Sequence, residues 1–182
     1  MTSVLRLSSG ALLALVALVA CGSDAKKSAP PTTTTPTTVA PTTTTTAPAT
    51  KIVVTSTAFT NNAPIPRQYS CEGASTVVPV AWSGIPADAK SVALEVHDPD
   101  APIPGGFLHW LVLGLPPRDG SVPPVPADAR QDPAWRGPCP PPGSDPHHYR
   151  FTVYALNKDV QSRSEIKDAT IARSTLVGTY RR

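Results

Sequence analysis

Proline placement constrains the fold of this chain more than any other feature of its sequence. The chain has 182 residues and 23 prolines, and 18 of these prolines follow residue 50. A proline inside a helix costs about 3 kcal/mol, so a helical bundle is excluded for that part of the chain. We therefore expect a mainly β fold, with short strands separated by proline-containing loops.

Segments rich in Val, Thr and aromatic residues recur after residue 50, each bounded by turn residues such as Pro, Gly, Asn or Asp. The expected strands are 52–58, 77–82, 91–96, 107–115 and 150–156. The segment 116–149 is long for a loop without structure of its own, which suggests that it shapes a ligand site.

One helix is expected late in the chain. Ser162 and Glu165 have the spacing of a capping box, in which two side chains satisfy free N–H groups at a helix start. An imperfect apolar face follows, and Gly178 is placed to end the helix. The residues of this face are Ile166, Ala169, Ile171, Ala172 and Leu176. Residues 179–182 would form a polar tail or a short edge strand.

The N-terminus has the pattern of a lipoprotein signal peptide. Arg6 precedes an uncharged apolar run at 11–19, which is shorter than the roughly 20 residues of a membrane-spanning helix. Small residues then lead into Cys21, as at a lipoprotein cleavage site. We expect residues 1–20 to be removed and Cys21 to carry acyl chains such as palmitate. An ordinary signal peptide with an incidental cysteine is the alternative.

Residues 21–50 are expected to form a tether, because Thr and Pro dominate them and almost no apolar side chains are present to bury. Extended polyproline II spans about 3.1 Å per residue, which gives the tether a reach of about 90 Å. Its composition also permits O-glycosylation of the threonines. The folded domain would then be 51–182, held at the cell membrane and facing outside the cytoplasm.

The charges of this domain nearly cancel, with 13 basic and 12 acidic residues and no Lys/Arg block. A nucleic-acid partner is therefore not expected. Two cysteines remain besides Cys21, an even number in a chain that leaves the reducing cytosol. We expect Cys71 and Cys139 to form a disulfide. Two free thiols are the alternative, since the sequence gives no distance between them.

Two polar clusters stand out. Asp98 and Asp100 precede His109, and the prolines and glycines between them exclude a helix. The second cluster, 137–149, combines a run rich in Gly and Pro with two histidines. The two clusters could form opposite walls of one small pocket.

Five motif segments extend over nearly all of 52–182. These are Ile65-Pro66-Arg67-Gln68-Tyr69-Ser70-Cys71-Glu72-Gly73, Val78-Pro79-Val80-Ala81-Trp82, Asp98-Pro99-Asp100-Ala101-Pro102 with His109-Trp110, Gly137-Pro138-Cys139-Pro140-Pro141 with His147-His148-Tyr149-Arg150-Phe151, and Leu176-Val177-Gly178-Thr179-Tyr180. In content and order these segments resemble the phosphatidylethanolamine-binding protein (PEBP) family, and its bacterial Raf-kinase-inhibitor-like branch in particular.

The resemblance implies a β-sandwich with a late helix, long pocket-forming loops and a small anion-binding cavity near one end. Family members bind phosphate-type groups, including the phosphoethanolamine head of a lipid, and some inhibit kinases or serine proteases. The binding positions carried over to this chain are Asp98, Asp100, Pro102, His109, Gly137, Pro138, His147 and Tyr149.

Several positions depart from the family pattern. His148 stands where the family has Arg, and an imidazole cannot reproduce the bidentate fork of a guanidinium. Ser75 and Gly114 each stand where the family has Asn. We expect these departures to affect ligand affinity more than the fold. His97 and His148 carry no family role, so we expect them to be surface or packing residues.

The expected function is binding of a small phosphate- or carboxylate-bearing ligand, with no cofactor and no metal. Asp98 or Asp100 suits the ammonium of a zwitterionic head group. The imidazoles of His109 and His147 and the phenol of Tyr149 suit its phosphate.

Three other functions are weighed against ligand binding. A His/Asp-based hydrolase would have to use water directly, because no serine has a G-x-S-x-G setting. A metal site would use the same side chains, but no zinc-binding spacing is present. A membrane-displayed inhibitor of proteases, or another protein-interaction module, is the third.

Overall fold

The structure is a computed structural model that describes residues 51–182. The predicted signal peptide 1–20, the predicted tether 21–50 and the predicted lipid site Cys21 lie outside the described residues. The elements in order are β1 (Val53–Thr55), β2 (Ala63–Pro64), the 3-10 helix η1 (Arg67–Tyr69), β3 (Val80–Ser83), β4 (Ser91–Asp98), β5 (Phe107–Leu115), β6 (Gly120–Val122), β7 (Arg130–Gln131), β8 (His147–Leu156), α1 (Arg163–Ala169) and β9 (Thr170–Tyr180). Within this range, no helix has both the length and the apolar character needed to cross a bilayer.

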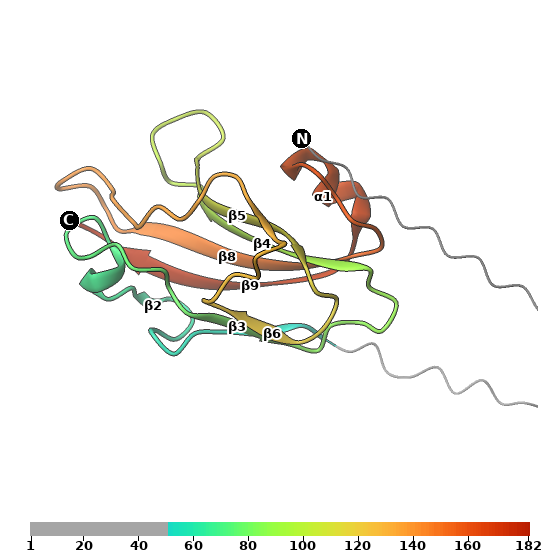
Figure 1. Cartoon of the computed structure of the whole chain (residues 1–182). Helices are drawn as coiled ribbons and strands as arrows, with labels where there is room; N and C mark the ends of the chain where they lie inside the picture. Colours follow the sequence, from blue (N-terminus) through green and yellow to red (C-terminus); the bar gives the residue numbers. More distant parts are fainter. Residues whose placement is uncertain (1–50) are drawn as a thin grey trace, which may run out of the picture. The chain divides into compact units, whose positions relative to one another are not determined.

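The strands form two sheets, and the predicted β-sandwich is confirmed (Figure 1). The small sheet has the order β1-β3-β6, and the large sheet has the order β2-β9-β8-β4-β5-β7. Neighbouring strands are antiparallel except for the parallel pair of β2 with β9.

Side-chain alternation along β8 shows how the core is built. Tyr149, Phe151 and Val153 are fully buried, while His148 and Arg150, which point the other way, are exposed. Period-two alternation of this kind places one face of the strand toward the partner sheet. Trp82 and Trp110 lie in the same core, as predicted, with 5% and 0% of their surfaces exposed.

The predicted helix is too long, and β9 replaces its second half. The structure ends α1 at Ala169, and β9 follows at once. From Thr170 on, exposure alternates with a period of two, and β-branched residues are frequent, which favours a strand. Gly178 therefore lies inside a strand instead of ending a helix. The predicted tail is also wrong, because β9 continues to Tyr180 between β2 and β8.

Ser162 precedes the helix as predicted, but the capping box is not formed as expected. Its hydroxyl donates to the carboxylate of Glu165 (2.8 Å) and caps no backbone N–H group. The Glu165 carboxylate instead accepts from the backbone N–H of Gln161 at 3.2 Å.

Most expected strands are present with shifted ends. The strand 107–115 has its predicted bounds, whereas β1 is shorter and β8 starts earlier than expected. The strands β2, β6 and β7 were not predicted, since pieces of two or three residues show no periodicity.

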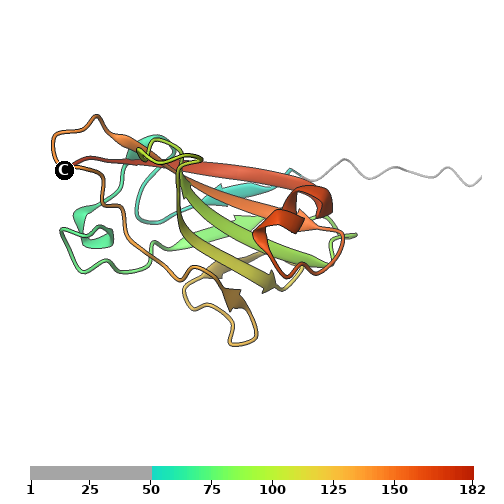
Figure 2. The same cartoon turned by 90° about the horizontal axis from the view of Figure 1, so that it is seen from above.

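One end of the sandwich gathers the long loops. The loops 99–106 and 137–146 meet where β4 ends and β5 and β8 begin, and α1 lies at the other end of these strands (Figure 1). The view turned by 90° shows the same separation (Figure 2). The two polar clusters of the sequence thus lie together, away from the helix.

Candidate functional site

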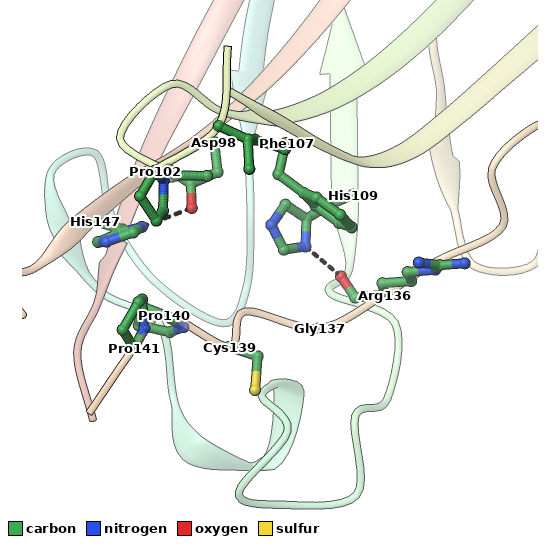
Figure 3. A pocket seen from close by; sticks show the side chains of 12 residues that line it. Asp98, Pro102, Phe107, His109, Arg136, Gly137, Cys139, Pro140, Pro141 and His147 are labelled. Atoms are coloured by element: carbon green, nitrogen blue, oxygen red, sulfur yellow. Dashed lines mark hydrogen bonds and ion pairs between the residues drawn. The ribbon is translucent and has the colours of Figure 1, made fainter. Parts of the chain in front are cut away.

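A cavity of about 300 Å³ lies at this loop end (Figure 3). The lining residues are Asp98, Ala101, Pro102, Ile103, Phe107, His109, Arg136, Gly137, Cys139, Pro140, Pro141 and His147. Of the predicted binding residues, five line this cavity: Asp98, Pro102, His109, Gly137 and His147. The structure places Asp100, Pro138 and Tyr149 outside its lining.

Asp98, at the end of β4, organises one side of the cavity. Its side chain is 3% exposed, and both carboxylate oxygens accept hydrogen bonds. Oδ1 accepts from the backbone N–H of Asp100 at 2.9 Å, and Oδ2 accepts from Nδ1 of His147 at 2.7 Å. Because Nδ1 must carry the proton to donate, the carboxylate fixes both the tautomer and the orientation of the His147 ring.

His109, on β5, occupies the other side. Its Nδ1–H donates to the backbone carbonyl of Arg136 at 2.8 Å. The ring meets the rings of Phe107 and Tyr149 edge-on, at centroid distances of 4.7 and 5.1 Å. Burial lowers the pKa of His109, and the smaller opposing effects of the carbonyl hydrogen bond and the Asp98 charge do not reverse this. The ring is therefore neutral near pH 7.

The two histidines share one arrangement. Each commits Nδ1 to a protein acceptor, and neither Nε2 atom makes a hydrogen bond within residues 51–182. A neutral Nε2 accepts a hydrogen bond and a protonated one donates. Each Nε2 can therefore accept a hydrogen bond from a ligand hydroxyl when the ring is neutral, or donate one to a ligand oxygen when the ring is protonated.

Tyr149 lies beneath the cavity wall and is fully buried. Its hydroxyl makes no hydrogen bond within the described residues. Burial, followed by the charge of Asp98, raises the pKa of Tyr149 above its usual range, so the phenol stays protonated. In this structure Tyr149 acts on the cavity by packing against His109.

Asp100 lies outside the cavity and binds His148. Its Oδ2 accepts from the backbone N–H of His148 at 2.7 Å and from its Nδ1 at 2.8 Å. Partial burial acts to raise the pKa of Asp100, but the hydrogen bonds and charge of His148 outweigh this and lower it. His148 therefore braces the acidic loop at the position where the family has Arg.

His97 braces the same loop from the other side, because its Nε2 bonds to the carbonyl of Gly105 at 2.8 Å. The exposed position of the His148 side chain agrees with the expected surface role. The contact of His97 was missed, since a backbone carbonyl leaves no trace in a sequence motif, and the contact of His148 with the Asp100 carboxylate was missed because it joins residues 48 apart in the sequence.

The second wall is fixed to the segment 69–76. Cys71 and Cys139 form the predicted disulfide, with sulfurs 2.03 Å apart. The N–H of Cys71 donates to the carbonyl of Pro138 at 3.0 Å. Gly137 runs so close to Tyr69 that a Cβ atom would lie 2.3 Å from its carbonyl oxygen, so a larger residue does not fit.

The departures at Ser75 and Gly114 concern backbone conformation. Both have positive φ, at 50° and 75°, a region that Asn and Gly adopt more readily than other residues. The Ser75 hydroxyl accepts from the N–H of Gly137 at 3.2 Å, so this residue supports the cavity wall. Gly114 lies on β5 outside the cavity lining, near Asp159.

Trp135 also belongs to the support of this wall. Its indole N–H donates to the carbonyl of Ser75 at 3.0 Å, and its ring packs on Trp110 at a centroid distance of 5.6 Å. The sequence left open whether this ring covers the pocket or packs beside it. The structure shows packing, since Trp135 is not part of the cavity lining.

Sequence reasoning missed the cation of the cavity, Arg136. Its guanidinium carbon lies 5.9 Å from the ring centroid of Phe107, a cation–π contact at the cavity edge. Figure 3 shows the Arg136 side chain beside the opening, with the His109 bond to its carbonyl drawn as a dashed line. Its position directly before Gly137 was a usable signal, because a cation there suits an anion pocket.

The lining of the cavity offers no free hydroxyl or thiol side chain as a nucleophile. The cavity wall contains no Ser or Thr, and its one cysteine, Cys139, is held in a disulfide. Within residues 51–182 no group of three His, Cys, Asp or Glu side chains is arranged to hold a metal ion.

Comparison with known proteins agrees with this geometry. The model of the phosphatidylethanolamine-binding protein family matches residues 55–181. This chain belongs to that family. The Mycobacterium tuberculosis protein LppC, whose name describes it as a lipoprotein, is 38% identical, with 99% of this chain and 99% of LppC covered.

Two solved structures support the assignment. Escherichia coli YbcL, described as a member of the mammalian PEBP family, superposes with a TM-score of 0.67 at 28% identity, over 72% of this chain and 99% of YbcL. A PEBP homologue from Chlamydia trachomatis gives a TM-score of 0.62 at 31% identity, over 73% of this chain and 99% of the homologue. The PEBP fold of this chain thus agrees with experimental structures of relatives.

The lowered pKa of His109 predicts acid-sensitive stability. Because the folded state disfavours the imidazolium, the unfolded chain takes up the proton first as pH falls below about 6.5. The free energy of unfolding therefore decreases as pH falls from about 6.5 through the lower pKa that His109 has in the folded protein. His109→Asn keeps an N–H donor for the Arg136 carbonyl but does not titrate, so its free energy of unfolding should fall less on acidification. Urea unfolding at neutral and at mildly acidic pH measures this, and equal pH dependence in both proteins would contradict it.

Proposed function

We propose that this PEBP domain binds small phosphate-bearing ligands, such as the phosphoethanolamine head group, in the cavity between His109 and His147. The observation that carries the proposal is the pair of histidines whose Nδ1 atoms are committed and whose Nε2 atoms are unbonded in the described residues. A cavity of about 300 Å³ is at the small end of the range for small-molecule sites, which suits a head group.

The electrostatics favour the phosphate part of the ligand. The second pKa of a phosphate monoester is near 6, so near pH 7 it can share a proton with an imidazole Nε2. Asp98, bonded to Nδ1 of His147, holds that ring in place and leaves its Nε2 for a ligand oxygen. Arg136 adds a positive charge at the cavity edge.

The ammonium of a zwitterionic ligand would find less support. Both oxygens of Asp98 already accept hydrogen bonds, and Asp100 lies outside the cavity. We therefore expect inorganic phosphate and phosphoethanolamine to bind with similar affinity. The sequence-based expectation, in which Asp98 or Asp100 binds the ammonium of the ligand, is replaced by one in which the phosphate supplies most of the affinity.

We further propose that the domain acts outside the cytoplasm on a lipid anchor at Cys21, as a binding protein and not as an enzyme. The signal-peptide pattern of residues 1–20 supports this location, and the name of the relative LppC is consistent with it. Mass spectrometry of the protein from membranes would test it by the acyl mass on a peptide that begins at Cys21.

Calorimetry with inorganic phosphate and with phosphoethanolamine tests the binding proposal. We expect dissociation constants of about millimolar or below, and binding at least tenfold weaker in His109→Asn, which lacks Nε2. Lys167→Gln, an exposed change on α1 at the opposite end, serves as the control and should bind like the parent. No heat with either ligand at millimolar concentration would overturn the proposal.

A further inference from the structure

We propose that one edge of the large sheet binds an extended acidic segment of another protein, which adds to the sheet as a further strand. The surface is the side of residues 170–176 that faces away from β8, and it is called the β9 edge below. It lies apart from the cavity between the two histidines, so the inference does not depend on the ligand of that cavity.

The two partner strands of β9 differ in length. β8 pairs with β9 from its first residue to its last, whereas β2 pairs only with Gly178 and Thr179. In the part of the chain that the structure describes, no other strand pairs with β9. Figure 2 shows β9 running from α1 along one border of the large sheet. The β9 edge is therefore the border of a sheet without a neighbouring strand in residues 51–182.

The backbone groups of this edge point outward. On the β2 side, the N–H of Val177 donates to the side chain of Asn61 at 2.9 Å, and its carbonyl accepts from the N–H of Asn62 at 2.7 Å. Every second residue of an antiparallel strand directs its backbone groups to the same side. Arg173 and Thr175 therefore direct theirs away from β8, where they make no hydrogen bond within the described residues. Such a row of groups is a template for another chain.

The β9 edge has little of the protection that edge strands usually carry. Proline, several charges or a very short strand normally prevent an unwanted chain from pairing. Residues 170–176 read Thr-Ile-Ala-Arg-Ser-Thr-Leu, with no proline and one charge. Ile171, 38% exposed, is one of the few large apolar side chains so open within 51–182. The β-branched residues of this stretch also favour strand pairing.

A cationic groove runs beside the edge and indicates the charge of the partner. The groove has a volume of about 550 Å³, and both β9 and α1 contribute to it. Its charged lining residues are three cations, Arg163, Lys167 and Arg173, and one anion, Glu95. The carboxylate of Glu95 is already bound by Nε and Nη2 of Arg163, at 2.6 and 3.2 Å. No carboxylate of residues 51–182 forms an ion pair with Lys167 or Arg173.

Charge selects this occupant over two others. Pairing of β9 with β9 of a second copy would bring Arg173 of both copies close together on one face, and like charges across strands are destabilising. The expected tether 21–50 contains Asp24 against Lys26 and Lys27, and its many prolines lack an N–H group. A segment of another protein with acidic side chains on one face satisfies both the edge and the groove.

Fluorescence anisotropy with labelled octapeptides tests the inference, using the full chain with Cys21→Ser so that no lipid anchor forms. In the first peptide valine and glutamate alternate, which places all carboxylates on one face of a strand. In the second, lysine replaces glutamate. We expect the first peptide to bind with a dissociation constant of about millimolar or below, and the second at least tenfold more weakly.

Two charge reversals locate the site. Arg173→Glu should weaken binding of the glutamate peptide at least fivefold and strengthen binding of the lysine peptide, because attraction and repulsion change places. Arg118→Glu is the matched control. Arg118 is exposed in the loop between β5 and β6 and does not line the groove, so its reversal should change both affinities less than twofold.

Amide hydrogen exchange distinguishes strand addition from attraction by charge alone. With saturating glutamate peptide, the N–H groups of Arg173 and Thr175 should exchange at least tenfold more slowly, since each gains an acceptor. No binding at millimolar peptide, equal affinity for both peptides, or unchanged exchange at these two residues would overturn the proposal. A dimer of the parent in which both N–H groups are already protected would overturn it as well, because a second copy would then occupy the edge.

Discussion

Replacing both Cys71 and Cys139 by serine should lower the free energy of unfolding by about 4 kcal/mol. The disulfide joins residues 68 apart in the sequence, so it removes the entropy of a long loop from the unfolded chain. Ordinary domains are stable by only about 5–15 kcal/mol, so this loss would remove a large part of the free energy that keeps the domain folded.

The same change should weaken ligand binding even where the domain stays folded. Cys139 belongs to the cavity wall, and the disulfide ties that wall to the segment after η1. Without it, the wall is held there by single contacts such as the hydrogen bond from Cys71 to Pro138. A wall that moves by a few tenths of an ångström would already displace the carbonyl of Arg136, which orients His109.

Urea unfolding of the parent, of the double serine variant and of the parent under a thiol reductant measures this effect. The reduced parent should match the variant, because both lack only the covalent link. Cys21→Ser is the control and should unfold like the parent. A loss of stability below about 1 kcal/mol would mean that the loop closure contributes little.

The β class and the strands β1, β3, β4, β5 and β8 follow from local pattern, whereas the helix-to-strand switch at Thr170, which produces β9, does not. The residues after Ile166 fit a helical face when they are read singly, but their branching and their pairing with β8 favour a strand. Sheet pairing is a long-range contact, so it overrides local periodicity without leaving a local signal.

The cavity was predictable as two walls but not in detail. Motif order brought Asp98, His109 and His147 together, because the strand ends that hold them meet in the fold. Tyr149 shares the inward face of β8 with His147 but lies two residues deeper, which removes it from the lining. The backbone carbonyl of Arg136 accepts the hydrogen bond that orients His109. This role could not be predicted from the sequence, because it depends on the path of the backbone and not on the side chain.

Replacing Asp98 by asparagine should cost about 2 kcal/mol of stability and weaken phosphate binding about tenfold. The carboxylate of Asp98 accepts two hydrogen bonds, one on each oxygen. An asparagine offers one oxygen and one NH₂ group, so it can satisfy only one of these two donors in place. The side chain is buried, and water cannot easily replace the missing acceptor.

Asp100→Asn is the matched control, since it removes a carboxylate two residues away. Asp100 and His148 are both exposed, and pairs of this kind contribute about 0–1 kcal/mol. Phosphate affinity should change less than threefold, because Asp100 does not line the cavity. Equal effects of the two substitutions on phosphate binding would contradict the central place given to Asp98.

Nitrogen NMR of the imidazole rings in Asp98→Asn shows which donor loses its acceptor, the backbone N–H of residue 100 or Nδ1 of His147. If the asparagine oxygen keeps the N–H of Asp100, its NH₂ group faces Nδ1 of His147, and the ring proton must move to Nε2. The His147 tautomer then changes while His109, bonded to the Arg136 carbonyl, keeps its proton on Nδ1. In that state Nε2 of His147 can donate one hydrogen bond to phosphate, but the ring is no longer held by a carboxylate. An unchanged His147 tautomer would show instead that the asparagine oxygen keeps Nδ1 of His147, and that the N–H of Asp100 loses its acceptor.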